Sequence, residues 1–310
     1  MKESGFKSIK DLPSTHMLGP GTPICAGCGA LEGIKIFCDI LGEKTVFVNA
    51  AGCMTLLTVY PFTPFKGSWI YTAMPSAPAG AQGVRDALDL LIRKGRLKPE
   101  EDLKVVVLTG DGTAYGMGLS STSGAIYRGL DFIYICYDNE GYGNTGYQFS
   151  AATPHAARTA TSKGPGGYQK YKKDLFAIWA AHKPAYVATV AGTEPLDLAR
   201  KIEKAKDLKG SKLFIAFSPC PTAWHFEPAK TIEVGKLAVK TGVWPLKECI
   251  DGKVVHTKVP LSKGKRPLVE EYLKIQGRFA HLFSPTRNEE VLEKIQTGVD
   301  DYWEETKSRD

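Results

Sequence analysis

Two short apolar runs, each stopped abruptly by glycine next to an acidic or amide residue, constrain the fold more than any other feature of the sequence. The first spans residues 105–108 and ends at the Gly-Asp-Gly of residues 110–112, and the second spans residues 132–137 and ends at the Asp-Asn-Glu-Gly of residues 138–141. Runs that are apolar on successive residues are typical of strands buried on both faces. Because a helix-length connector separates them, they predict a βαβ unit with parallel strands and a right-handed crossover.

The polar residues that end these runs are expected to meet at one edge of the sheet. Asp111 and Asn139 follow the carboxyl ends of strands that lie about 4.8 Å apart if they are neighbours, and opposite ligands of a magnesium ion lie about 4 Å apart. The Asp111 carboxylate, the Asn139 amide oxygen and the Gly141 carbonyl therefore predict a Mg²⁺ site with positions left for phosphate oxygens and water. Gly110 and Gly112 would allow the backbone to approach that phosphate closely.

Turn chemistry offers a second interpretation of both segments. Gly, Asp and Asn dominate turns for conformational reasons alone, and Gly-Asp-Gly by itself is too short to be specific. Two such segments that each close a buried strand favour the ligand site, because ligands commonly bind at this edge of open α/β sheets.

The rest of the chain continues the alternation of strands and helices. At 310 residues and 43% hydrophobic, it can bury a sizeable core as one large α/β domain or two smaller ones. We predict an α/β fold with a doubly wound, mostly parallel sheet, with further strands at 45–49, 69–73, 185–190 and 212–217 and helices at 30–41, 77–94, 174–182, 195–208 and 230–241. Residues 1–245 would form this domain.

Two further segments stand apart from that alternation. Residues 149–171 are rich in Ala, Thr, Ser and Gly and predict a loop, and a structureless segment of that length within a compact domain is usually functional. Residues 246–310 are more polar, with helical patterns at 268–282 and 288–303 and no strand series. We expect them to form an extension that wraps the domain or a partner subunit.

Composition excludes several classes of protein. The amino terminus has no apolar signal segment and no apolar run approaches the length of a membrane span, so we expect a soluble cytoplasmic protein. Basic clusters interleaved with aromatic residues are absent, which argues against a nucleic-acid partner. The formal charge of +7 would suit an acidic electron carrier or anionic cofactors, although a solvated surface with surplus lysine is the more ordinary explanation.

Seven cysteines, an odd number without a secretion signal, argue against a disulfide framework and for metal or redox chemistry. Cys25-x-x-Cys28, Cys53 and Cys220 each adjoin a predicted turn or strand end, at the same kind of edge as the magnesium site. Four such thiolates could hold a tetrahedral zinc ion or a [4Fe–4S] cluster. A thioredoxin-like dithiol would use only the first two. Cys38 falls inside a helix and is expected to be a small core residue.

Eight segments carry a resemblance to a known family, in the order found there: CAGCG, VNAAGC, GDGTAYGMGL, YDNEGYGNTGYQ, ATPHAA, SPCPTAW, TGVWPL and VEEYLKIQGRF. The chain resembles the β subunits of pyruvate and other 2-oxoacid:ferredoxin oxidoreductases over nearly its whole length. The resemblance implies the fold of thiamine diphosphate (TPP) enzymes. It also implies oxidative decarboxylation of a small 2-oxoacid, with TPP as nucleophile and electron sink and with electrons passed through a cluster to ferredoxin.

The resemblance also assigns roles to individual residues. The family's [4Fe–4S] ligands correspond to Cys25, Cys28, Cys53 and Cys220, and its Mg²⁺ ligands to Asp111, Asn139 and the Gly141 carbonyl. Asn144, which is followed by Thr145, would place its side chain near the TPP thiazolium and the substrate and is the one candidate catalytic residue. The acid that activates the aminopyrimidine belongs to a different subunit in this family, so other subunits of α and γ/δ type are expected partners, and coenzyme A is a further candidate ligand.

Two departures from the pyruvate-type pattern lie near the expected cofactor pocket. Met74-Pro75-Ser76 stands where those subunits commonly carry Phe-Glu-Asn, and Gly143 where they carry a larger residue, often Met. Another 2-oxoacid, including oxalate, thus becomes a candidate substrate beside pyruvate.

Two other classes of function stay open at this point. One is a TPP carboligase or decarboxylase without electron transfer, in which the cysteines are structural. The other is an electron-transfer or scaffold subunit that binds no TPP. In every case Glu140 is expected to be a solvent-facing turn carboxylate, and His155 and His225 to be loop histidines without a catalytic role.

Overall fold

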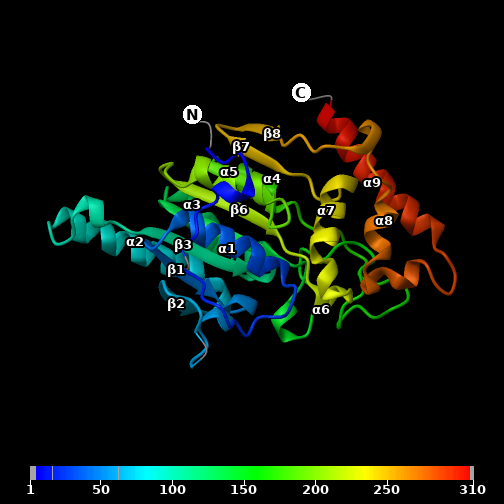
Figure 1. Cartoon of the computed structure of the whole chain (residues 1–310), viewed down its shortest axis with the longest axis horizontal. Coiled ribbons are helices and arrows are strands. Elements are labelled where there is room, and N and C mark those ends of the chain that lie inside the picture. Colours follow the sequence, from blue (N-terminus) through cyan, green and yellow to red (C-terminus); the bar gives the residue numbers. More distant parts are fainter. Residues whose placement is uncertain (1–4, 16, 62, 308–310) are drawn as a thin grey trace.

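A single eight-stranded sheet runs through the computed structural model, which describes residues 5–15, 17–61 and 63–307 (Figure 1). Its strands are β1 (Thr45–Ala50), β2 (Ser68–Thr72), β3 (Lys104–Gly110), β4 (Phe132–Asp138), β5 (Tyr186–Ala191), β6 (Ser211–Phe217), β7 (Lys247–Ile250) and β8 (Lys253–His256). They are ordered β2-β1-β3-β4-β6-β5-β7-β8. The first six are parallel, whereas β7 is antiparallel to β5 and β8 to β7.

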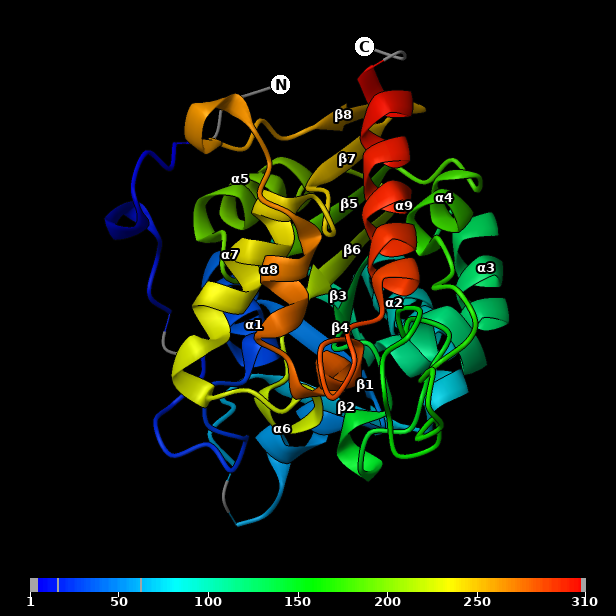
Figure 2. The same cartoon turned by 90° about the vertical axis from the view of Figure 1, so that its right-hand side faces the viewer.

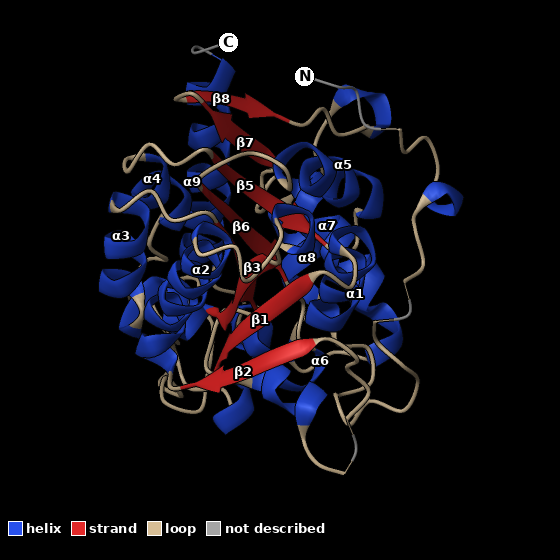
Figure 3. Ribbon diagram, turned by 90° about the vertical axis from the view of Figure 1, so that its left-hand side faces the viewer, coloured by secondary structure: helices blue, strands red, loops and turns tan. Residues whose placement is uncertain are grey.

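Helices cover both faces of this sheet, as Figure 3 shows with the strands seen between two layers. They are α1 (Gly29–Leu41), α2 (Ala77–Arg93), α3 (Leu119–Tyr127), α4 (Leu175–Ala180), α5 (Pro195–Ala205), α6 (Pro221–Trp224), α7 (Thr231–Thr241), α8 (Val269–Lys274) and α9 (Glu289–Lys307). The buried side chains of α1 and α5 share one core cluster, and those of α2, α3 and α4 belong to the cluster on the other face. The predicted doubly wound α/β fold is confirmed.

The central βαβ unit forms as the apolar runs predict. β3 and β4 are parallel neighbours, with Thr109 paired to Cys136 and Gly110 to Tyr137. All seven residues of β4 are buried, which explains why apolar residues occupy successive positions in that run. The connector begins with the π-helical turn Gly112–Met117 and continues as α3. Asp111 and the residues after Asp138 therefore leave the sheet side by side at the same edge.

The extension after residue 246 differs from its prediction, because it contains two strands. β7 and β8 form a hairpin that continues the sheet beside β5. Asp251 and Gly252 make its two-residue turn, with φ of 51° and 77°, and Asp-Gly is a preferred pair for such turns. Each strand has only four residues, and β8 is mostly exposed. The alternation of apolar and polar residues that would mark a strand is therefore not recognisable in the sequence.

The remaining part of the extension lies over the same end of the domain as α7 (Figure 2). The predicted helix at 268–282 is divided into α8 and the 3₁₀ turn Gly277–Leu282, and α9 follows. Residues 149–171 contain no helix or strand, as predicted. None of the helices in the described ranges is both long enough and apolar enough to span a bilayer.

Candidate active site

Two adjoining cavities open at the carboxyl edge of the sheet, and together they are lined by every predicted site residue. The larger, of about 720 Å³, is lined by Cys25, Cys28, Cys53 and Cys220. The smaller, of about 180 Å³, is lined by the predicted phosphate and metal residues Gly110, Asp111, Gly112, Asn139, Gly141, Asn144 and Thr145. Both cavities share Cys53, Leu56, Asn139, Gly143 and Asn144 in their walls. Segments far apart in the sequence thus converge on one site.

Three oxygen-bearing groups meet at the predicted metal position. The inner atom of the Asn139 carboxamide lies 2.8 Å from both Asp111 Oδ1 and the Gly141 carbonyl oxygen. With its nitrogen turned inward, the amide donates to both. With its oxygen inward, the amide oxygen lies from each of the other two acceptors at about the 3 Å separation of adjacent ligands on an octahedral Mg²⁺ with bonds of about 2.1 Å. The residues present therefore fit a small, hard cation.

The electrostatics of Asp111 lead to the same conclusion. Its side chain is 0% exposed, and its Oδ2 accepts a hydrogen bond from the Ser150 hydroxyl. Among the described residues, no ion pair includes Asp111. Burial and the neighbouring Asp138 charge raise the pKa of Asp111 well above its usual value. A buried carboxylate of this kind is stable as an anion only beside a cation.

Behind Asp111 lies a buried network of charges that the sequence did not reveal. Lys172 Nζ lies 2.7 Å from Asp138 Oδ2 and 3.1 Å from Glu140 Oε1. Arg278 Nη2 lies 2.6 Å from Glu140 Oε2, and the Tyr115 hydroxyl donates to Asp138 over 2.6 Å. Through Asp138 and Glu140, this network holds the turn that carries the predicted metal residues Asn139 and Gly141.

The prediction that Glu140 is a solvent-facing turn carboxylate is therefore wrong. Its residue is 3% exposed. Burial opposes ionisation, but the charges of Lys172 and Arg278 outweigh it and hold the pKa of Glu140 below its usual value. Its backbone is left-handed, with φ of 61°, a conformation that non-glycine residues seldom adopt.

Glycine is required at 112 by the close approach of an aromatic ring. A Cβ atom on Gly112 would lie 2.1 Å from Cε1 of Tyr142. The Tyr142 ring, in the loop after the metal turn, also lines the smaller cavity. Because Gly112 has no side chain, the loop of residues 139–146 can pack its Tyr142 ring directly on the Gly-Asp-Gly backbone at the wall of the smaller cavity.

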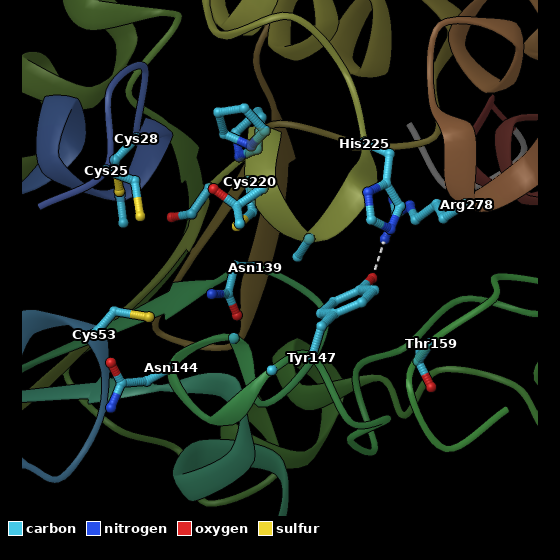
Figure 4. Close-up of a pocket in the computed structure, with 18 of the residues that line it drawn as sticks. Cys25, Cys28, Cys53, Asn139, Asn144, Tyr147, Thr159, Cys220, His225 and Arg278 are labelled. Atoms are coloured by element: carbon cyan, nitrogen blue, oxygen red, sulfur yellow. Dashed lines mark hydrogen bonds between the residues drawn. The ribbon is translucent and has the colours of Figure 1, made fainter. Parts of the chain in front are cut away.

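The four predicted cluster cysteines come from three segments of the chain and face the larger cavity (Figure 4). Cys28 precedes α1, Cys53 begins the 3₁₀ turn Cys53–Thr58, and Cys220 precedes α6. The backbone N–H of Gly29 donates to the carbonyl of Pro219 over 3.1 Å, and a Cβ on Gly29 would lie 2.7 Å from Pro219 Cδ. This contact docks the Cys25–Cys28 turn against the loop of Cys220.

Burial favours the protonated form of three of these thiols, those of Cys28, Cys53 and Cys220, when they carry no metal. It raises the pKa of Cys28 to about 11 and that of Cys53 to about 12, and it also raises the pKa of Cys220. In the described part of the chain, no three His, Cys, Asp or Glu side chains are close enough to hold a single metal ion. A cluster, in which each thiolate binds a different iron, needs a wider separation of its sulfurs than a single ion does. Cys38 is fully buried in α1, as predicted.

Asn144 lies beside both groups of predicted ligands, and Thr145 beside the predicted metal residues. Asn144 is exposed to the cavities and lines both of them, and Figure 4 shows its side chain near Cys53 and Asn139. Thr145 Oγ1 donates to Gln148 Oε1 over 2.5 Å, which closes the loop. His225 also lines the larger cavity, next to Arg278, whereas His155 stacks on Tyr171 away from it.

A pocket with oxygen-bearing groups at the carboxyl edge of a parallel sheet lies where open α/β proteins commonly bind ligands, and sequence similarity identifies the class as that of TPP enzymes. The family model described as thiamine pyrophosphate enzyme, C-terminal TPP binding domain, matches residues 50–216. In fold, the chain is similar to a 2-oxoglutarate:ferredoxin oxidoreductase from Magnetococcus marinus, solved with 2-oxoglutarate, coenzyme A and succinyl-CoA bound. The TM-score is 0.60 at 21% identity, and the match covers 83% of this chain and 89% of that one.

Curated relatives match almost the whole chain. Pyruvate synthase subunit PorB of Methanothermobacter thermautotrophicus is 43% identical over 298 residues, which is 95% of this chain and 98% of that protein. The subunit of the same name from Thermotoga maritima is 39% identical, covering 92% and 89%. Ketoisovalerate oxidoreductase subunit VorB of Pyrococcus abyssi is 36% identical, covering 96% and 94%. The chain belongs to the family of 2-oxoacid:ferredoxin oxidoreductase β subunits, and it is one subunit of a TPP-dependent oxidoreductase.

Proposed function

We propose that this subunit binds Mg²⁺ and TPP diphosphate in the smaller cavity and a [4Fe–4S] cluster in the larger one. Asp111, Asn139 and the Gly141 carbonyl would hold the metal ion, and Cys25, Cys28, Cys53 and Cys220 the cluster. The complex would oxidatively decarboxylate a small 2-oxoacid, pyruvate or oxalate, and pass the electrons to ferredoxin. When bound, TPP supplies a carbon nucleophile and an electron sink, and the cluster accepts electrons one at a time.

The observation that carries this proposal is the wall that the two cavities share. Cys53, on the cluster side, and Asn139, on the metal side, both line each cavity. A cofactor that reacts at the junction would lie next to the first electron acceptor, so electrons would not have to cross bulk protein. A zinc site or purely structural cysteines would not need to lie next to the cavity of the proposed metal site.

The residues at the junction have three tasks. Asn144 would donate its amide hydrogens to the oxygens of the bound 2-oxoacid and orient it. Gly143 leaves space there, because a Cβ on it would lie 2.7 Å from the Asn139 side chain and 3.5 Å from Cys53 Sγ. The mainly apolar lining of the larger cavity, with Ile24, Leu56 and Ala223 among its residues, would exclude water and support a low cluster potential.

A partner subunit is required to complete the chemistry. Among the described residues that line the two cavities, Asp111 is the only carboxylate, and it is committed to the metal position. None of the described residues that line the two cavities is then left to act as the acid on the aminopyrimidine. We propose that subunits of α and γ/δ type supply this acid, and that the net charge of +7 favours an acidic ferredoxin. Coenzyme A is an optional further substrate, and the assembly would operate in the cytoplasm.

The substrate can be identified by reduction of a low-potential dye by the intact complex. Pyruvate, 2-oxoglutarate, 2-oxoisovalerate, oxalate and glyoxylate would be tested in turn, each with and without coenzyme A. Activity with oxalate that is independent of coenzyme A would identify an oxalate enzyme, because loss of both carbons as CO₂ leaves no acyl group to transfer. Activity with pyruvate that requires coenzyme A would identify a pyruvate enzyme.

Two controls decide whether the cofactor assignments hold. Asp111→Ala should abolish turnover that depends on TPP while the cluster spectrum stays intact, and unchanged turnover would refute the metal site. Iron and acid-labile sulfide should be present in equal amounts, about four of each per chain. Their absence would leave a non-redox TPP carboligase or decarboxylase with structural cysteines.

A further inference from the structure

One residue of the C-terminal extension reaches into the candidate active site as a fully buried cation. Arg278 lies in the 3₁₀ turn Gly277–Leu282, and its side chain is 0% exposed. Its Nη2 donates to Glu140 Oε2 over 2.6 Å, its Nη1 to the Tyr147 hydroxyl over 2.8 Å, and its Nε to Gln276 Oε1 over 2.8 Å. The guanidinium carbon lies 3.7 Å from the centre of the Trp224 ring. These contacts fix the planar guanidinium in one orientation.

The partners of Arg278 belong to three separate parts of the site. Glu140 lies between two of the proposed metal ligands. Tyr147 closes the loop that follows them, and Figure 4 shows its hydroxyl bonded to the guanidinium. Trp224 comes after Cys220, and its indole N–H donates to the backbone carbonyl of Asn139 over 3.0 Å. One guanidinium therefore contacts three segments: the turn of residues 139–141, called the metal turn below, the loop that follows it, and the segment after Cys220.

The metal turn needs such a contact because of the backbone at Glu140. A left-handed φ of 61° is unfavourable for a residue with a side chain. The side chain is anchored at both carboxylate oxygens, by Lys172 on one and Arg278 on the other. In this conformation the inner atom of the Asn139 amide lies 2.8 Å from both the Gly141 carbonyl oxygen and Asp111 Oδ1. Loss of one anchor would let the turn relax and separate the three oxygens.

We propose that Arg278 is a positioning residue for the metal site, and that it acts through Glu140 and Tyr147 rather than by touching the metal or TPP. The proposal rests on the function proposed above, because it presumes that Mg²⁺ binds at this turn. On this proposal, the 3₁₀ turn of residues 277–282 contributes to the active site. Loss of a partner that orients a metal ligand typically weakens metal affinity 10- to 100-fold.

The test measures Mg²⁺-dependent binding of TPP to the intact complex, without turnover. TPP is removed with EDTA, and rebinding is followed by equilibrium dialysis at increasing Mg²⁺. Arg278→Gln should raise the Mg²⁺ concentration for half-saturation 10- to 100-fold, and Arg278→Lys should raise it less, because it keeps the charge but loses the planar fork. Iron content should stay at the wild-type value in both.

Arg266 provides a matched control within the same extension. Its guanidinium carbon also lies 3.7 Å from an indole ring, that of Trp303, and it donates to backbone carbonyls of Val239 and Lys240. It lines neither of the two cavities. Arg266→Lys should therefore leave the Mg²⁺ dependence unchanged. A lower thermal stability of Arg278→Gln with wild-type Mg²⁺ dependence would overturn the proposal, because it would show a purely structural role.

Two further variants keep the outcomes separate. If Arg278→Gln does not fold, Arg278→Lys and Tyr147→Phe decide, and wild-type Mg²⁺ dependence in both would overturn the proposal. Asp111→Asn tests the metal site itself. If Asp111→Asn loses Mg²⁺-dependent binding while the Arg278 variants keep it, only the role of Arg278 is refuted. If Asp111→Asn binds as wild type does, the metal site is wrong and the role of Arg278 falls with it.

Discussion

Replacing Asp111 by asparagine should stabilise the metal-free protein and destabilise the loaded one relative to wild type. The carboxylate is fully buried, and the ion pairs of Lys172 go to Asp138 and Glu140 instead. An uncompensated buried charge costs several kcal/mol, and asparagine keeps the shape without the charge. A lost or weakened hydrogen bond to Ser150 would offset about 1 kcal/mol of that gain. We expect metal-free Asp111→Asn to be more stable than wild type by about 1–3 kcal/mol at pH 8.

The pH dependence follows from the raised pKa of Asp111. A carboxyl group whose pKa is higher in the folded state than in the unfolded state favours folding when protonated. The destabilisation is therefore absent below the unfolded pKa of about 3.9, grows as the pH rises, and is complete above the folded-state pKa. The advantage of Asp111→Asn should vanish near pH 4 and grow as the pH rises toward the raised folded-state pKa.

Ligand binding should reverse the order of stability. Mg²⁺ and TPP at 1,000 times the dissociation constant would stabilise the wild type by about 4.1 kcal/mol, whereas Asp111→Asn lacks a ligand and should gain little. The assay is hydrogen exchange by mass spectrometry on peptides of β3 and β4 in the intact complex, with EDTA or with Mg²⁺ and TPP. Slower exchange in wild type than in Asp111→Asn under EDTA at pH 8 would refute the reasoning, because Asp111 would then be a structural residue.

Three other perturbations test neighbouring parts of the site. Glu140→Gln leaves the buried Arg278 without a carboxylate and takes one of two carboxylates from Lys172, and it should cost about 3–5 kcal/mol of stability. Glu304→Gln, in an exposed pair with Lys307, should leave the melting temperature unchanged, and equal losses would contradict the buried network. In cluster-free protein, the raised pKa values of Cys28 (about 11) and Cys53 (about 12) predict that alkylation by iodoacetamide becomes about tenfold faster per pH unit from pH 7 to 9. A bound cluster should protect both thiols. Mass spectrometry would follow the alkylation, and a rate that does not change with pH would contradict the raised pKa values. Gly112→Ala should displace the Tyr142 ring and abolish TPP binding, measured by dialysis, whereas Gly124→Ala in α3, with no atom within 4 Å, should bind TPP normally.

The parallel pair β3 and β4 could be predicted because its signals are local. Each strand is buried on both faces, so its residues are apolar in succession, and each ends in turn residues. The position of Asp111 beside Asn139 then follows from strand geometry alone. The same reasoning failed for the hairpin at 247–256, where edge strands of four residues carry lysines and only the Asp-Gly turn marks them.

The burial of Glu140 could not be predicted, because its counter-charges are remote in the sequence. Lys172 lies 32 residues away and Arg278 lies 138 residues away. A carboxylate in a glycine-rich turn is ordinarily solvated, and nothing in a single sequence shows which distant cations will meet it. The usable hint was the length of the loop at 149–171, which leads directly into Lys172.

The charges around the metal turn explain why the site should take a metal together with an anionic cofactor. Three buried carboxylates, Asp111, Asp138 and Glu140, face two cations, Lys172 and Arg278. With all three carboxylates ionised, one negative charge is left over, and it belongs to Asp111, the carboxylate that lines the cavity. A divalent cation there would change the surplus to one positive charge, which in a buried site is itself unfavourable until an anion arrives. A diphosphate group meets that requirement, so metal and cofactor should bind cooperatively, each weakly without the other.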